Sequence, residues 1–228
     1  MKIKKQYNTR MMELIFFAAI AAFVVYRLFA TLGREEGFDI KKILESGFAA
    51  GKDQKTQENK NSNAQDANFE VISKIEAALS DNVRQELDKI KQKETFDVKT
   101  FIDTVKTVFE IVLNAFYKNG VEALKELLSS QLYSEFIHEI GKRRDSGLLH
   151  EVTLVGIKDV QILDVSVKDN IASIKVKIES DQIKVIKDKD QKIITGSVHQ
   201  ILRLSDIWTF QKDLTQKNYW ELTETNSK

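Results

Sequence analysis

Residues 160–178 read Val-Gln-Ile-Leu-Asp-Val-Ser-Val-Lys-Asp-Asn-Ile-Ala-Ser-Ile-Lys-Val-Lys-Ile, with apolar side chains at alternate positions on both sides of Asp169-Asn170. Alternation of this kind indicates β-strands with one buried face, and an Asp-Asn pair between two such runs is typical of a tight turn. The alternation changes phase between Ile162 and Leu163, which predicts a β-bulge or a strong bend. The stretch therefore predicts an antiparallel strand pair.

Further strands are predicted downstream of this pair. Residues 187–190, Lys-Asp-Lys-Asp, are expected to form a charged hairpin tip. A long strand is expected from Ile193 to about Lys212, and a last strand is centred on Trp220 and Leu222. Together with the first pair, these segments predict a four-stranded antiparallel meander.

Upstream of the strands the apolar period becomes helical. Residues 98–116 place apolar side chains on one face and charged ones on the other, with Asp97 as the expected N-cap and Gly120 as the expected stop. Further helices are expected over residues 121–128 and from about Gln131 to Gly147. Helices followed by antiparallel strands predict an α+β domain over residues 96–228, in which a bent sheet wraps the helices and leaves an apolar hollow.

An amphipathic helix is predicted over residues 69–95. Its apolar stripe has the three-to-four spacing of a helix and consists of Ile72, Ile75, Leu79, Val83, Leu87 and Ile90. Basic and acidic side chains are balanced on the other face, whereas a helix on a membrane surface would have a cationic face. Packing on the domain or on a partner is therefore favoured over lipid contact. Residues 35–68 are expected to be a polar flexible linker, because residues 52–68 contain no large apolar side chain.

Residues 1–34 are predicted to form an N-terminal transmembrane helix. The apolar run from Leu14 to Leu32, which includes Phe17 and Phe23, would span about 28 Å as a helix, close to the thickness of the hydrocarbon core. Arg27 lies near one end, where its guanidinium can reach the headgroups. A cleaved secretory signal and a buried core helix are the alternatives. Cleavage after Ala30 would place leucine at position −3, which disfavours the signal.

The orientation of this anchor depends on nearly equal numbers of flanking cations. Four basic residues precede the apolar run and four lie within or after it. Translation from Met11 or Met12 instead of Met1 would remove the four basic residues that precede the run. The basic residues that remain would then keep the C-terminal domain on the cytoplasmic side, because the more basic flank of a membrane helix stays there. We therefore expect a single-pass protein with a cytoplasmic domain.

Composition and motifs argue against several classes of function. The 228 residues carry a net charge of +1, so nucleic acid is not expected as the main partner. The chain has no cysteine, which excludes disulfides and thiolate metal sites. His138, His150 and His199 lack metal-ligand spacing, and no phosphate-binding loop or nucleophile motif occurs. We expect no enzyme activity, no metal and no cofactor; for Tyr133 and Asp206, a structural role is favoured over catalysis.

Several segments resemble the Tim44-like domain family, whose namesake tethers the import-motor Hsp70 at the mitochondrial inner membrane. The most specific is Asp-Ile-Trp-Thr-Phe-Gln-Lys-Asp at 206–213. The others are 101–109, 115–120, 132–136, 144–147 and 218–225, and the anchor at 14–23 with Leu-Gly-Arg at 32–34 resembles bacterial members. Two departures occur at turns: Asn218-Tyr219 replaces Pro-Asn before Trp220, and Val121 replaces an acidic residue.

The resemblance implies a cone fold like that of nuclear transport factor two, membrane association and a role near protein translocation. The first hypothesis is a scaffold or adaptor at the bacterial inner membrane that binds chaperone, translocase or ribosome proteins. The alternative is a module that binds lipid or an acyl chain, and a pocket enzyme is third. An open hollow would favour lipid, and a filled cone with an exposed apolar patch would favour a scaffold.

Two sets of candidate site residues follow. The wall of the hollow is predicted to include Phe109, Phe116, Tyr133, Phe136, Asp206, Trp208 and Phe210. Ordinary core packing is the competing interpretation for these aromatic side chains. Contact with the membrane or with anionic lipid is predicted for Leu14, Phe17, Phe23, Arg27, Lys142, Arg143 and Arg144. Lysines 184, 187, 189 and 192 would add attraction to anionic lipid if they share one face with the basic residues at 142–144.

Overall fold

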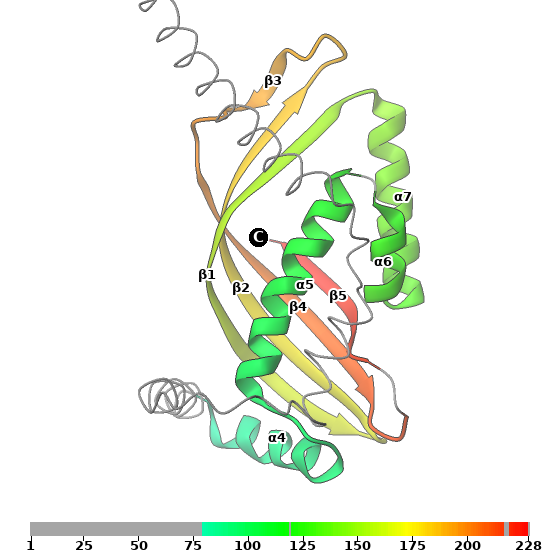
Figure 1. Cartoon of the computed structure of the whole chain (residues 1–228), viewed down its shortest axis with the longest axis vertical. Helices are drawn as coiled ribbons and strands as arrows, with labels where there is room; N and C mark the ends of the chain where they lie inside the picture. Colours follow the sequence, from blue (N-terminus) through cyan, green and yellow to red (C-terminus); the bar gives the residue numbers. More distant parts are fainter. Residues whose placement is uncertain (1–78, 119, 217–218, 228) are drawn as a thin grey trace, which may run out of the picture. The chain divides into compact units, whose positions relative to one another are not determined.

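A computed structural model of the chain describes residues 79–118, 120–216 and 219–227 (Figure 1). The predicted anchor, the linker and the first part of the amphipathic helix lie outside these residues. Within the described ranges, no helix is both long and apolar enough to cross a bilayer.

The predicted hairpin forms from β1 (Leu149–Lys168) and β2 (Ile171–Lys187). Asp169 and Asn170 have φ angles of 49° and 67° and form the two-residue turn between them. Positive φ at both positions matches the twist of a tight hairpin, and Asn and Asp tolerate it. A register shift lies between Ile162 and Asp164, so the bulge predicted from the phase change is confirmed.

The sheet is antiparallel, in the order β1-β2-β4-β5, with β3 paired to β2. The prediction of one strand from Ile193 to Lys212 is wrong, because β3 (Ile193–Gly196) and β4 (Leu202–Asp213) are separate. Gly196 ends β3 at φ 84°, and a Cβ there would lie 2.1 Å from the carbonyl oxygen of Lys184. Among the described residues, the sheet therefore has five strands rather than the predicted four, the last being β5 (Glu221–Ser227).

Three helices agree closely with their predicted ranges. α5 (Val98–Lys118) begins after Asp97, whose carboxylate accepts the Thr100 N–H at 2.7 Å. α6 (Val121–Leu127) is short, and α7 (Ser130–Ser146) ends at Gly147, which has φ 70°. The left-handed conformation at that glycine is the usual way to end a helix. The N-cap at Asp97 and the stop at Gly147 are thus confirmed.

The first described helix, α4 (Asp81–Lys93), is shorter than predicted. Ser80 has an extended backbone (ψ 155°), and its hydroxyl accepts the Val83 N–H, so the apolar stripe does not continue as one helix through this residue. The buried side chains of α4 pack against the domain, and Glu86 accepts the Val167 N–H of β1 at 2.9 Å. Of the uses proposed for this stripe, packing on the domain is the one observed.

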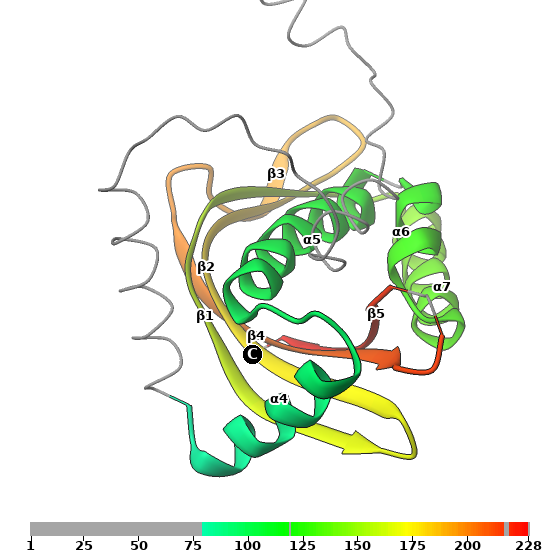
Figure 2. The ribbon, with the colours of Figure 1, turned by 60° about the horizontal axis from the view of Figure 1, so that its bottom comes forward.

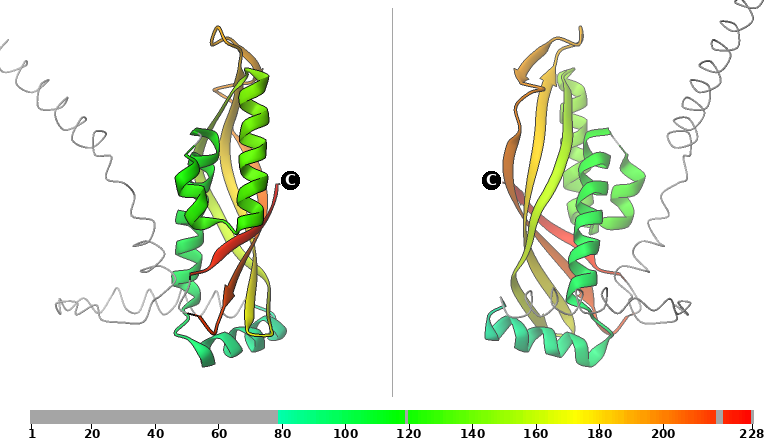
Figure 3. Two further views of the ribbon diagram at one scale, coloured as in Figure 1. Left: turned by 90° about the vertical axis from the view of Figure 1, so that its right-hand side faces the viewer. Right: turned by 60° about the vertical axis from the view of Figure 1, so that its left-hand side comes forward.

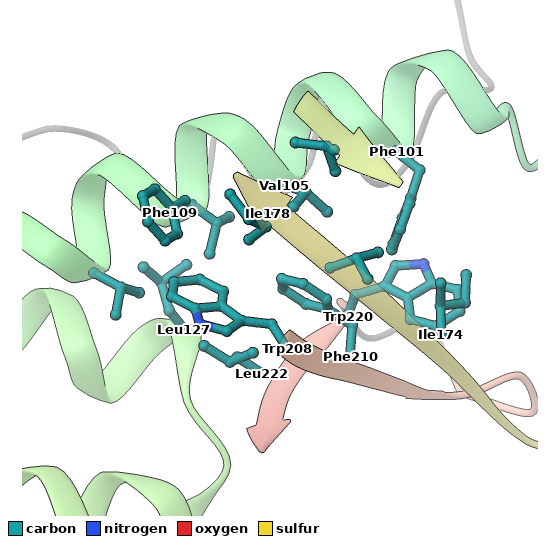
Figure 4. Packing of buried hydrophobic residues seen from close by; sticks show 14 of the residues in the cluster. Phe101, Val105, Phe109, Leu127, Ile174, Ile178, Trp208, Phe210, Trp220 and Leu222 are labelled. Carbon is teal, nitrogen blue, oxygen red and sulfur yellow. The ribbon is translucent and has the colours of Figure 1, made fainter. Parts of the chain in front are cut away.

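The core lies between α5 and the concave side of the sheet, which curves around this helix (Figure 2). α5, α6 and α7 lie on one side of the strands, and α4 lies across one end (Figure 3). Phe101 packs against Phe210 and Trp220, with ring centroids 5.8 and 5.4 Å apart (Figure 4). The predicted α+β class and the inward face of α5 are confirmed.

Candidate functional site

An apolar hollow of about 240 Å³ opens beside the core, between α5, α7 and the sheet. Its wall is largely aromatic and aliphatic, and Trp208 of β4 faces Phe109 of α5 with ring centroids 5.0 Å apart. The residues that line it are Phe109, Val112, Leu113, Phe116, Tyr117, Leu132, Glu135, Phe136, Glu139, Gln182, Lys184, Asp206, Trp208 and Thr225. The bent sheet and two helices therefore leave one region of the concave face open.

The charged groups of the hollow are mostly carboxylates, which accept hydrogen bonds. Asp206 is buried in β4, whereas Glu135 and Glu139 are exposed on α7, one turn apart. Three carboxylates thus accompany a single ammonium group, that of Lys184. Gln182 is buried, and its side-chain carbonyl oxygen has no hydrogen-bond partner within the described part of the chain. The hollow consequently combines apolar walls with acceptor groups suited to a cationic or N–H-bearing ligand.

Arg143 joins the ends of α5 and α7 beside the hollow. Its guanidinium stacks over the Phe116 ring at 3.8 Å and lies 5.0 Å from the Tyr117 ring centroid. One of its nitrogens donates to the Phe116 carbonyl oxygen at 2.8 Å, a group that the last turn of α5 leaves without a helical partner. Burial lowers the pKa of Arg143 from its ordinary value. Arg143 therefore supports the helix packing, and its contact with lipid stays a prediction.

A second, basic cleft of about 270 Å³ lies between the C-terminal end of α7 and the β2–β3 hairpin. Arg143, Arg144, His150 and Lys189 line it together with the carboxylate of Asp188. Tyr117 lines both cavities, and burial raises the pKa of its phenol. The two basic segments noted in the sequence therefore do meet, through Arg144 and Lys189.

Comparison with known proteins identifies the family. The sequence model of the Tim44-like domain matches residues 83–227. The chain belongs to the Tim44-like domain family. The matched region begins at Val83, within α4, which agrees with the packing of this helix against β1. The resemblance drawn from the sequence is thereby confirmed.

Proteins similar to this Tim44-like protein include a curated relative and a solved structure. Uncharacterized protein RP434 of Rickettsia prowazekii is 31% identical over 142 residues, which cover 57% of this chain and 65% of the relative. The chain thus spans just under two thirds of that relative's length. The intermembrane space region of the chloroplast protein ARC6 has a TM-score of 0.40 at 13% identity, over 55% of this chain and 95% of that one.

The predicted hollow residues of the Tim44-like domain are only partly brought together. Phe109, Phe116, Phe136, Asp206 and Trp208 line the hollow. Tyr133 is half-buried against the core outside this lining, and Phe210 lies in the core between Phe101 and Trp208.

Sequence reasoning missed the acidic rim of the hollow. A signal for it existed, because Glu135 and Glu139 flank the apolar position Phe136 at helical spacing. Gln182 and Lys184 of β2 gave no comparable signal. Within the part of the chain that the structure describes, no group of three His, Asp or Glu side chains is arranged to hold a metal ion.

The role assigned to Arg143 can be tested by substitution. Arg143→Lys keeps the charge but loses the planar stacking and the hydrogen bond to the α5 carbonyl. We therefore expect it to lower the free energy of unfolding by about 1–2 kcal/mol. Arg144→Lys is the matched control, because the Arg144 side chain is 79% exposed; its effect should stay within about 0.5 kcal/mol. Chemical denaturation measures both. Equal stability of the two variants would contradict the structural role of Arg143.

Proposed function

We propose that this Tim44-like domain is the polypeptide-binding part of a membrane-anchored adaptor at the bacterial inner membrane, and that its hollow receives apolar side chains of a cationic segment. The observation that carries the proposal is the lining of the hollow. Its walls are aromatic, and it carries the three carboxylates of Glu135, Glu139 and Asp206 but one ammonium group, that of Lys184. Family membership supports a role in binding proteins or membranes. No chemical step is included in the proposal.

The size of the hollow favours side chains over a whole small molecule. Pockets that enclose small molecules usually measure about 300–1,000 Å³, and an engineered apolar cavity of about 150 Å³ holds benzene. A volume of about 240 Å³ lies between these values and suits one or two large side chains. Positive charges on the same segment would meet the carboxylates of α7 at the rim, so charge would select among apolar partners.

Peptide binding by the full chain, held in phosphatidylcholine nanodiscs as its predicted anchor requires, tests this function. The probe is a fluorescein-labelled amphipathic peptide with leucines on one face and arginines on the other, and its twin carries glutamate in place of arginine. We expect the arginine peptide to bind at least tenfold more tightly by fluorescence anisotropy. Glu135→Gln with Glu139→Gln should weaken that binding about tenfold, because two ion pairs of up to about 1 kcal/mol each are lost.

Glu110→Gln provides the matched control, since Glu110 is exposed on α5 outside the lining of the hollow. It should leave binding of the arginine peptide unchanged. Equal affinity for the two peptides, or equal losses in the rim and control variants, would refute the proposed specificity.

A second function, binding of anionic lipid, is favoured by the basic cleft. Arg144 and Lys189 lie on its lining, and the apolar hollow nearby is open, as a lipid-binding module requires. However, the rim of the hollow is acidic, which disfavours an anionic headgroup at its mouth. Phosphatidylglycerol vesicles that displace the arginine peptide, and that lose this effect with Arg144→Glu, would place lipid binding first.

A further inference from the structure

We propose that the outer edge of β3 is a second binding site, which takes up an extended, acidic and apolar polypeptide segment as an added strand. This site is independent of the hollow. Its proposed partner is acidic, whereas the proposed partner of the hollow is cationic. β3 lies at the end of the sheet away from α4, where the β2–β3 hairpin extends beyond the helices (Figure 1).

The backbone of this edge has no strand on its outer side among the described residues. β3 pairs only with β2, through Val185, Ile186 and Lys187. β5 begins to pair with β4 at Asp206, so residues 202–205 also lack an outer neighbour within the described ranges. Every residue of β3 is exposed to solvent. A strand edge offers a row of N–H and C=O groups, and another extended backbone is the partner that satisfies them.

The side chains of β3 and of its connection to β4, residues 193–201, are unusually apolar for an exposed surface. Ile193, Ile194, Val198 and Ile201 are 38%, 50%, 47% and 56% exposed, within a span of nine residues. Natural proteins usually protect an open edge with charged side chains or proline. Here the β-branched Ile193 and Ile194 lie on β3, and Val198 and Ile201 follow in the connection to β4. Exposed apolar side chains at a strand edge are the pattern expected where the side chains of an added strand are to be packed.

The hairpin is held in a defined conformation, so the edge is formed in advance of binding. Asp188 accepts the N–H groups of Asp190 and Lys192 through one carboxylate oxygen, each at 2.9 Å. Its own N–H donates to the Lys192 carbonyl oxygen at 3.0 Å. Gly196 ends the strand against the Lys184 carbonyl. An edge that is already ordered loses less conformational entropy when a segment binds.

Charge favours an acidic partner at this edge. Of the lysines of the hairpin, Lys184 lines the hollow, Lys187 is paired with Glu151 at 2.7 Å, and Lys189 lines the basic cleft. Lys192 is exposed and directly precedes β3. A glutamate or aspartate beside the apolar residues of an incoming segment can pair with its ammonium group.

The test uses the full chain in phosphatidylcholine nanodiscs and a fluorescein-labelled peptide of alternating Glu and Ile or Val. We expect micromolar binding by anisotropy. A twin peptide that is N-methylated at alternate amides, and therefore cannot pair along one edge, should show no measurable binding. Ile194→Thr with Ile201→Thr should weaken binding at least tenfold. Leu163→Thr, which changes an exposed apolar residue on β1, is the matched control and should have no effect.

Several outcomes would overturn the proposal. Equal binding of the N-methylated twin would exclude strand addition, and equal loss with Leu163→Thr would indicate nonspecific adhesion. A dimer of the full chain by light scattering that Ile194→Thr with Ile201→Thr dissociates would show that β3 pairs with a second copy instead. The arginine peptide reports on the hollow separately. Its binding should be unchanged by Ile194→Thr with Ile201→Thr, so failure at either site can be recognised on its own.

Discussion

Trp208→Ala is expected to lower the free energy of unfolding by about 3–5 kcal/mol, the usual cost of truncating a large buried aromatic side chain. Trp208 is 5% exposed and contacts the rings of Phe109 and Phe210. Its removal would enlarge the hollow toward the core, and the surrounding β4 backbone, paired on both sides, cannot collapse to fill it. A domain of this size has about 5–15 kcal/mol of stability, so this loss would threaten folding.

Denaturation followed by the fluorescence of the remaining Trp220 measures this loss. Phe136→Ala is the matched variant, because Phe136 lines the same hollow from α7 but is only half-buried. Phe136→Ala should lower the free energy of unfolding by less than Trp208→Ala does. It should also weaken binding of the arginine peptide, because the Phe136 side chain contributes mainly to the wall of the hollow. An unchanged unfolding midpoint for Trp208→Ala would mean that Trp208 serves ligand contact alone and not the core.

Local sequence patterns predicted the elements of the fold well where one physical cause dominates. The Asp169-Asn170 turn, the bulge beside Leu163 and the helix stop at Gly147 each depend on the conformational preferences of a few neighbouring residues. The separation of β3 from β4 was missed for a different reason. Glycine is required at position 196 because a Cβ there would lie 2.1 Å from the Lys184 carbonyl oxygen, a contact that arises only after the strands have paired.

The candidate site was predicted less completely than the fold, for the same reason. Aromatic residues of the hollow were found because they share apolar stripes with the core. Tyr133 and Phe210 share those stripes too, and periodicity does not separate a residue at the edge of a hollow from one in the core beside it. The stacking of Arg143 on Phe116 links positions 27 residues apart, and no local pattern indicates it.

Lys212→Met is expected to destabilise the domain by about 3 kcal/mol, the low end of the cost of breaking a buried ion pair. The side chain of Lys212 is 8% exposed, and it pairs with Glu94, whose side chain is 19% exposed at the end of α4. The second carboxylate oxygen of Glu94 is buried without a hydrogen-bond partner among the described residues. Without the ammonium group, this carboxylate would remain in a poorly solvated position.

Adding Glu94→Gln to Lys212→Met should recover most of the lost stability, because no unpaired charge then remains buried. Urea denaturation of the two single variants and the double variant gives the coupling energy between the two side chains. The pair joins the end of α4 to β4, which carries Trp208 and the wall of the hollow. A cost below about 1 kcal/mol for Lys212→Met would instead be typical of a solvated surface pair. In that case α4 would be held mainly by its apolar stripe, and the hollow would not depend on this ion pair.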